Sequence, residues 1–356
     1  MKSTAWIGVL LVLVLPLPAC AGNWLGKWEL DRVNRRLGGK IIDHTHNHGA
    51  DRRIWSAALG QCRDLYVYVP PGFDPRQQYP LILWLHGFAQ DEHSFLHDVI
   101  DPIDRAIVGG KLPPLIFAAP DGSFNGRASY VSAGSFFLNT KAGAFEDYLM
   151  RDVWDFLVQN YPLRPEREAH VLAGASMGGG AAYNLAIKYR ERFGTVLGIY
   201  PPLNERWVDC HGRYMGNFDP DCWGWRTDVR KGHEVVGRFY GVVTIRLKQV
   251  LDPLYDRRQP QTIDELSREN PIEMLESHNV KAGDLAMYVA YGGRDQFNID
   301  AQVESFLHVA RQRGLCVGVS YEPRGRHDRA TALRLVPGIL DWLAPLMAPY
   351  SPAQGR

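Results

Sequence analysis

The segment VLAGASMGGGAA, residues 171–182, places a serine where it could act as a nucleophile. An apolar run leads into Gly174-Ala175-Ser176-Met177-Gly178, a G-x-S-x-G pattern, and a helix-forming run follows. The glycines allow neighbouring backbones to pass closely, and the serine projects at the positive end of the next helix. This strand–turn–helix context predicts that Ser176 is a catalytic nucleophile. The alternative is a tight turn that carries no chemistry.

A serine hydroxyl needs a base, and the G-x-S-x-G serine is followed along the chain by an acid and then a histidine. His327 lies in RGRHDRATA, a loop between the apolar run CVGVSYEP and the last expected helix. A histidine there can reach over the nucleophile, so His327 is predicted to be the base; the alternative is a surface histidine. The other downstream histidines fall in an expected helix (His308) or in a long insertion (His211, His233 and His278).

The acid is predicted to be Asp295, in the glycine turn of YVAYGGRDQF at the end of an apolar run. A carboxylate at that position can orient His327 and stabilise the imidazolium that forms. Its alternative role is that of a helix N-cap. The other downstream acids lack the strand–turn context, because they lie in the insertion (Asp252, Asp256 and Asp264) or beside the base (Asp328).

Acyl chemistry of this kind also needs two backbone N–H groups that bind the negative oxygen of the intermediate. The residue after the nucleophile, Met177, is expected to supply one of them. The second is expected from Phe88, in the loop of LILWLHGFAQDE that Gly87 allows to turn. His86 is interpreted as a brace for this loop, since it precedes the nucleophile in the chain.

These residues require a scaffold, and the chain from Asp64 onward alternates short apolar runs with amphipathic stretches. The alternation predicts an α/β fold with a mostly parallel, doubly wound sheet. The expected strands are DLYVYVP, PLILWLH, LIFAAP, HVLAGA, TVLGIY, LAMYVAY and CVGVSYEP. The expected helices include residues 144–161, 177–193, 300–314 and 330–347.

About eighty residues, 203–283, interrupt this alternation between TVLGIY and LAMYVAY. An insertion at the carboxyl ends of parallel strands lies over the ligand site, so it is predicted to be a cap or lid; the alternative is a remote surface elaboration. A helix is expected around GRFYGVVTIRLKQVL, residues 237–251. Cys210 and Cys222 bracket a loop here and are predicted to form a disulfide, rather than a zinc site, for which the spacing is wrong.

The N-terminus predicts export, because Lys2 is followed by a short apolar run that ends in small residues. Residues 1–21 would form an ordinary signal peptide, or residues 1–19 a lipoprotein signal that leaves Cys20 as a lipid anchor. A buried helix is the third alternative. Export to the periplasm, cell envelope or medium would place Cys62, Cys210, Cys222 and Cys316 in an oxidising compartment, where three pairings are open. Residues 22–60 are interpreted as an extension with an edge strand, and residues 61–348 as the catalytic domain.

In DHTHNHGADRR, residues 43–53, the histidines His44, His46 and His48 alternate as metal ligands on one strand face could. A serine mechanism needs no metal, however, and the stretch precedes the first expected sheet strand. The favoured interpretation is a structural segment at the sheet edge, with a metal site as the alternative.

Composition restricts the partners. Lys and Arg total 40 against 39 for Asp and Glu, so no strong field favours nucleic acid or an anionic membrane. The 10 Trp, 16 Tyr and 14 Phe suit a large core and an aromatic-lined substrate groove.

Between Gln61 and Leu346 the chain resembles the esterase D-type branch of the α/β-hydrolases. The resemblance rests on YVYVPPGFDP, PLILWLHGF, APDGS, SFFLNTKAGAFEDYL, GASMGGGAA, YGGRD and GRHD. That branch includes feruloyl and acetyl-xylan esterases, tributyrin-type esterases, S-formylglutathione hydrolases and mycobacterial mycolyltransferases. The resemblance implies a Ser176–Asp295–His327 triad with Phe88 and Met177 as the oxyanion hole. The long insertion departs from the branch, and a signal peptide disfavours the cytosolic S-formylglutathione chemistry.

The sequence thus predicts an exported serine ester hydrolase that needs no metal or organic cofactor. Its expected substrates are acyl or feruloyl esters of polysaccharides and small acyl esters, and membrane contact is expected only through a lipid on Cys20. The alternatives are an acyltransferase or peptidase with the same triad, or a non-catalytic envelope lipoprotein.

Overall fold

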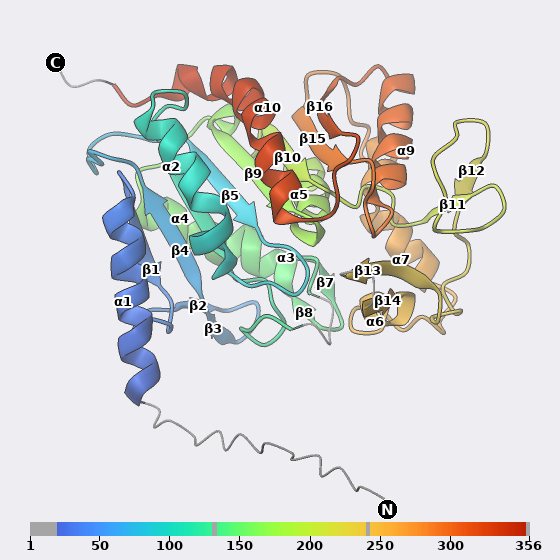
Figure 1. Ribbon diagram of the computed structural model, residues 1–356, viewed down its shortest axis with the longest axis horizontal. Coiled ribbons are helices and arrows are strands. Elements are labelled where there is room, and N and C mark those ends of the chain that lie inside the picture. The colour runs from blue at the N-terminus through green and yellow to red at the C-terminus, as the bar shows by residue number, and fades with distance from the viewer. Residues whose placement is uncertain (1–19, 130–133, 240–242, 354–356) are drawn as a thin grey trace, which may run out of the picture.

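A computed structural model describes residues 20–129, 134–239 and 243–353, and its centre is an eight-stranded sheet (Figure 1). The strand order is β1-β4-β6-β5-β9-β10-β15-β16. All neighbours from β6 to β16 are parallel, whereas β4 is antiparallel to both β1 and β6. The strands are β1 (Lys40–His44), β4 (Leu65–Val69), β5 (Leu81–Leu85), β6 (Ile116–Pro120), β9 (His170–Ala175), β10 (Thr195–Ile199), β15 (Ala286–Gly292) and β16 (Val317–Glu322). The predicted mostly parallel sheet is confirmed.

Helices cover both faces of this sheet, as the uninterrupted apolar strands require. In Figure 1, α2 and α10 lie in front of the sheet, and α4 and α5 lie behind it. The helices of this body are α2 (Ile100–Val108), α3 (Phe145–Asp147), α4 (Trp154–Asn160), α5 (Met177–Lys188), α8 (Pro271–Ser277), α9 (Ile299–Gln312) and α10 (Arg329–Met347). π-Helical turns precede α2 (Phe95–Val99) and α4 (Tyr148–Val153), and 3-10 turns occur at Arg167–Ala169 and Ala348–Tyr350. Two two-stranded ribbons complete it, β2 (Ile54–Ser56) with β3 (Gln61–Arg63) and β7 (Asn139–Thr140) with β8 (Gly143–Ala144).

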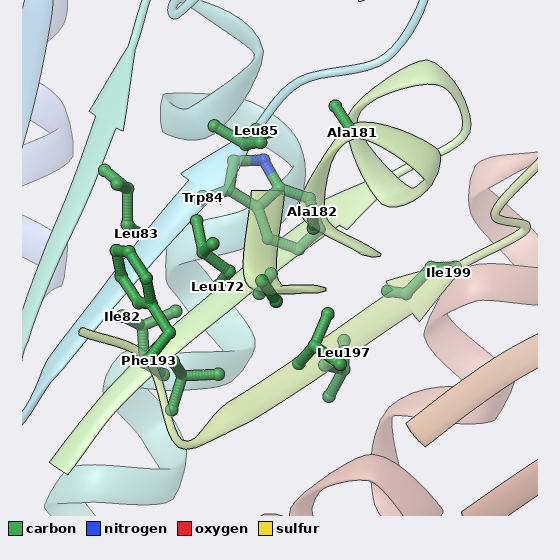
Figure 2. Close-up of a cluster of buried hydrophobic side chains, with 14 of the residues drawn as sticks. Ile82, Leu83, Trp84, Leu85, Leu172, Ala181, Ala182, Phe193, Leu197 and Ile199 are labelled. Carbon is green, nitrogen blue, oxygen red and sulfur yellow. The ribbon is translucent and has the colours of Figure 1, made fainter. Parts of the chain in front are cut away.

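The main core lies between the sheet and these helices. Figure 2 shows buried side chains of β5, β9, β10 and α5 gathered there, with Trp84 and Phe193 among them. The helix α5 is small-residue-rich at its start, and this lets it lie close against β9 and β10, the strands that precede and follow it. This packing holds the turn at Ser176 in place.

The N-terminal segment forms the sheet edge. The helix α1 (Cys20–Arg36) lies beside β1, which pairs with β4 as the predicted edge strand. The predicted signal peptide lies outside the described residues apart from its last positions.

The three alternating histidines point to separate partners. His44 Nε2 lies 2.7 Å from the Tyr161 hydroxyl, and His46 Nδ1 lies 2.8 Å from Asp64 Oδ1. The ring of His48 bridges Gly26 O and Tyr66 Oη, at 2.6 Å each. Strand β1 ends at His44, so the strand alternation that would align the three rings stops there. The structural interpretation of this stretch is therefore supported, and the three rings share no ligand centre.

Most of the insertion forms a smaller unit with its own apolar cluster. Its elements are β11 (Trp207–Asp209), β12 (Trp223–Trp225), β13 (Val235–Phe239), β14 (Val243–Arg246), α6 (Leu247–Leu251) and α7 (Thr262–Glu269). Trp207, Tyr214 and Leu254 are buried in the cluster. The predicted disulfide between Cys210 and Cys222 is present, and Cys62 and Cys316 are free thiols. We use the name cap unit for residues 207–269.

The prediction of a helix over residues 237–251 is wrong. The β13 and β14 strands pair in an antiparallel ribbon there, and of the residues that the structure describes in this range, only those of α6 are helical. The segment is rich in β-branched valine, threonine and isoleucine, which lose side-chain freedom in a helix and favour strands. At the other end of the predicted insertion, α8 packs Ile272, Met274 and Leu275 into the main core against α5.

Candidate active site

Ser176 lies at the tip of a sharp turn between β9 and α5. Its φ of +53° and ψ of −124° are outside the common regions, a conformation that persists only where the surroundings impose it. Its N–H donates to Ile199 O at 2.7 Å. A Cβ on Gly174 would overlap the Gly178 carbonyl, and a Cβ on Gly178 would overlap the Leu85 carbonyl. The glycines are therefore required by close backbone contact.

The structure brings the three predicted triad residues together, although their sequence positions span 151 residues. His327 Nε2 lies 2.9 Å from Ser176 Oγ, and His327 Nδ1 lies 2.7 Å from Asp295 Oδ2. The Asp295 side chain has no exposed surface and that of His327 is 12% exposed. Asp295 Oδ1 accepts the Phe297 N–H at 2.8 Å, so both carboxylate oxygens are engaged. The arrangement allows proton transfer from Ser176 to His327.

Neighbouring groups orient His327 in ways that the sequence did not reveal. The Gln296 side chain accepts the His327 backbone N–H at 2.9 Å. The rings of Tyr200 and Phe297 each lie 4.8 Å from the imidazole centre. The charge of Asp295 also acts on a neighbouring acid, Asp300 in the first turn of α9. Burial, and then the charge of Asp295, raise the pKa of Asp300 to about 6. Of the groups around His327, only Gln296 could have been suspected from the sequence, because it directly follows Asp295.

The loop after β5 passes beside the nucleophile, as predicted for the oxyanion hole. A Cβ on Gly87 would lie 3.4 Å from Ser176 Cβ, and both Phe88 and Met177 line the same cavity as Ser176. The imidazole of His86 accepts the Gly122 N–H at 2.8 Å and lies 3.0 Å from Gly87 O. His86 is 2% exposed and thus braces the loop from inside the protein.

The Ser176 hydroxyl opens on a cavity of about 390 Å³. One side, the sheet side, lies under α2 and α10 and is lined by Val171, Leu197, Ile339 and Leu343 among others. The other, the cap side, includes Val229, Val236, Ile245 and Leu254. The insertion thus contributes to the wall of the cavity. Of the five downstream histidines, all within the described residues, His327 alone lines it.

Two ionisable residues of the cavity wall, Arg226 and Glu205, were not identified from the sequence. Arg226 is 8% exposed, pairs with Glu234 and lies over the Tyr214 ring at 5.8 Å. Its Nη2 is buried without a hydrogen-bond partner among the described residues. Glu205 also lines the cavity, where burial and then the negative charge of Glu269 raise its pKa to about 8. A pKa near 8 keeps most of the Glu205 carboxyl protonated at pH 7.

Glu205 makes the stability of the fold depend on pH. Because its pKa is raised on folding, the folded state binds more protons than the unfolded state between about pH 4.5 and 8, and stability falls as pH rises through that window. Glu205→Gln should remove this loss and raise the relative stability at pH 8 by about 1–3 kcal/mol, a value reduced for solvent in the cavity. Thermal denaturation at pH 5, 6.5 and 8 measures it. A melting-temperature difference from wild type that does not change with pH would contradict it, and Glu276→Gln, at an exposed position of α8, is the control.

A family model described as "Putative esterase" matches residues 56–332. An endo-1,4-beta-xylanase/feruloyl esterase of Xylanibacter ruminicola is 26% identical over 163 residues, which are 42% of this chain and 21% of that protein. Esterase Rv1288 of Mycobacterium tuberculosis is 24% identical over 254 residues, 69% of this chain and 47% of that protein. The chain thus spans less than half the length of these relatives.

Solved structures share the fold. A ferulic acid esterase superposes with a TM-score of 0.62 and 16% identity, over 87% of this chain and 99% of the other. The S-formylglutathione hydrolase of Agrobacterium tumefaciens superposes with a TM-score of 0.58 and 16% identity, over 87% and 96%. The α/β-hydrolase fold expected from the sequence is confirmed by these likenesses.

Proposed function

The chain belongs to the esterase family whose model it matches over residues 56–332, and from this premise we propose that it is a serine carboxylic-ester hydrolase that works through an acyl-enzyme. The observation that carries the proposal is the hydrogen-bonded series Ser176–His327–Asp295 in the wall of the cavity. The names of its relatives, which include feruloyl esterases, agree with it.

In the acylation step, His327 Nε2 takes the proton of Ser176 as Oγ attacks the ester carbonyl. Asp295 accepts from Nδ1–H and stabilises the imidazolium. The N–H groups of Phe88 and Met177 bind the oxyanion of the tetrahedral intermediate. His327 then gives its proton to the alcohol oxygen, the C–O bond breaks, and the acyl group stays on Ser176.

Deacylation repeats these steps with water as the nucleophile. His327 takes a proton from water as its oxygen attacks the acyl carbonyl, and it returns the proton to Ser176 Oγ when the C–O bond to the enzyme breaks. The chain's own residues provide each proton transfer, so the reaction requires no cofactor.

The cavity favours esters with a sizeable apolar substituent, because both its sides are lined mostly by aliphatic side chains. On the cap side, Arg226 is a cationic residue in an otherwise mostly aliphatic wall, and its guanidinium is suited to an acceptor such as a phenolic or methoxy oxygen. We therefore propose feruloyl and larger acyl esters as substrates, including those attached to polysaccharide, with small acyl esters as poorer ones.

We also propose that the protein is exported, and the Cys210–Cys222 disulfide supports an oxidising compartment. The proposed catalytic domain is residues 61–348 with the insertion at 203–283. Whether processing leaves Cys20 lipidated is tested by mass spectrometry of the mature N-terminus.

A series of esters tests the substrate proposal. From p-nitrophenyl acetate to the hexanoate, kcat/KM should rise by up to about fourfold per methylene, since each buried CH₂ contributes about 0.8 kcal/mol. Methyl ferulate should be hydrolysed as well. A steady fall in kcat/KM with chain length, with no turnover of methyl ferulate, would contradict it.

The same assays separate the rival functions. Formation of a new ester from an added alcohol in preference to free acid would favour an acyltransferase, and cleavage of peptide substrates would favour a peptidase. No burst of p-nitrophenol and no labelling by a fluorophosphonate probe would refute the serine esterase and favour a binding role.

A further inference from the structure

Three side chains of types that bind metal ions meet on the surface at α1. None of them is close to the catalytic triad in the sequence. Glu29 of α1 lies between His93 and His97, which follow the loop of Gly87 and Phe88. His93 Nε2 is 3.1 Å from Glu29 Oε2, and His97 Nε2 is 3.0 Å from Glu29 Oε1. The three side chains are 38%, 48% and 33% exposed for His93, His97 and Glu29. Solvent and small ions can therefore reach them.

The spacing of the two histidines is suited to holding a metal. They are four residues apart in HSFLH: His93 lies in the turn before the π-helical segment Phe95–Val99, and His97 lies within that segment. The ring centres are 5.1 Å apart, and both Nε2 atoms face the one carboxylate. Two imidazoles from one segment and a carboxylate from another form a donor set that zinc binds in proteins.

The distances fit such an ion. Zinc–ligand bonds of about 2.0–2.1 Å at tetrahedral angles put neighbouring ligand atoms about 3.3 Å apart. The two histidine–carboxylate distances of 3.0 and 3.1 Å are close to this value, and all the ligand atoms lie within 4.8 Å of one another. A small movement of the two rings would complete the arrangement, with water as a fourth ligand.

Other groups in the described residues suit a metal less well. The buried acids Asp64, Glu92 and Asp121 lie together, but the Arg63 guanidinium is 2.6 Å from Asp121 and already supplies a positive charge. Cys210 and Cys222 are joined in a disulfide and do not offer thiolates. We propose that Glu29, His93 and His97 form a binding site for a zinc-like divalent transition-metal ion.

Such an ion would join α1 to a segment that contacts the loop of the catalytic base. Asp98, next to His97, pairs with Arg329 Nε at 2.8 Å, and His97 O accepts from Arg329 Nη2 at 3.1 Å. Arg329 follows His327 by two residues. Metal binding is thus expected to hold α1 against the body and to stabilise the fold by mass action.

Binding of zinc to untagged protein, stripped with EDTA, tests the proposal by titration calorimetry and thermal denaturation. Wild type should bind one equivalent and melt at a higher temperature with zinc, and magnesium should have no such effect. His93→Asn, His97→Asn and Glu29→Gln should each weaken binding by at least about tenfold, since even the loss of an outer-shell partner costs 10–100-fold.

The control is His233→Ala, an exposed histidine of the cap unit, which should bind zinc as wild type does. The proposal is overturned if wild type binds no zinc at millimolar concentration, or if the His93→Asn/His97→Asn double variant binds it as tightly as wild type. The latter result would place the zinc elsewhere, for example at His327. Circular dichroism establishes that each variant is folded. Because binding is the readout, failure here leaves the esterase proposal untouched.

Discussion

Ser176→Ala should lower kcat for ester hydrolysis by about 10⁴–10⁶-fold and abolish labelling by a fluorophosphonate probe. The alanine has no oxygen to form the acyl-enzyme, so only binding and the oxyanion hole remain to assist attack by water. The substitution removes one hydroxyl that faces the cavity, at a position whose backbone N–H donates to the Ile199 carbonyl. The fold should therefore be retained, which thermal denaturation checks. Burst kinetics with p-nitrophenyl acetate measure the loss.

Ser277→Ala is the matched control, because Ser277 is exposed at the end of α8 and does not line the cavity. It should be labelled and should turn over substrate as wild type does. A Ser176→Ala protein that keeps a burst or is still labelled would place the nucleophile at another residue.

Asp295→Asn should lower kcat by about 10⁴-fold with little change in substrate binding. The carboxylate now accepts Nδ1–H of His327 at 2.7 Å and leaves Nε2 free to take the serine proton. An amide NH₂ at that position favours the opposite tautomer, in which Nε2 carries the proton. A protonated Nε2 cannot act as the base for Ser176. Asn can still accept the Phe297 N–H through its oxygen, so the turn should persist.

Steady-state kinetics on p-nitrophenyl butyrate measure this effect, and Asp264→Asn is the control. Asp264 is one of the downstream acids considered from the sequence, and it lies exposed on α7. It should retain wild-type kcat. A kcat for Asp295→Asn within tenfold of wild type would show that another group orients His327.

Patterns within short segments of the chain predicted most of the sheet strands and the three candidate triad residues. The strands were recognised because buried parallel strands are continuous apolar runs, and Ser176 because its glycines occur where a strand meets a helix. Asp295 and His327 were selected because each follows a later strand, and parallel strands end at the same edge of a sheet. The structure places these three side chains in contact, and their catalytic roles are what the two variants above test.

Contacts between segments that are distant in the chain could not be predicted from such local patterns. The alternation of His44, His46 and His48 suggested a shared face, but β1 ends at His44 and each ring has its own partner. The β-branched residues of β13 and β14 lie in a strand pair, because each of these strands finds a partner within the cap unit, where a helix had been expected. In both cases the local pattern was compatible with two structures, and packing selected one.

The sequence by itself determined the fold class, the turn at Ser176, the disulfide and the candidates for the acid and the base, because each depends on neighbouring residues or on chain order. Tertiary structure alone decided the shape of the cavity, the placement of Arg226 and Glu205 in its wall, and the meeting of Glu29 with His93 and His97. These features join segments that lie tens to hundreds of residues apart. Their geometry is set by how side chains fill space between elements, which no local pattern encodes.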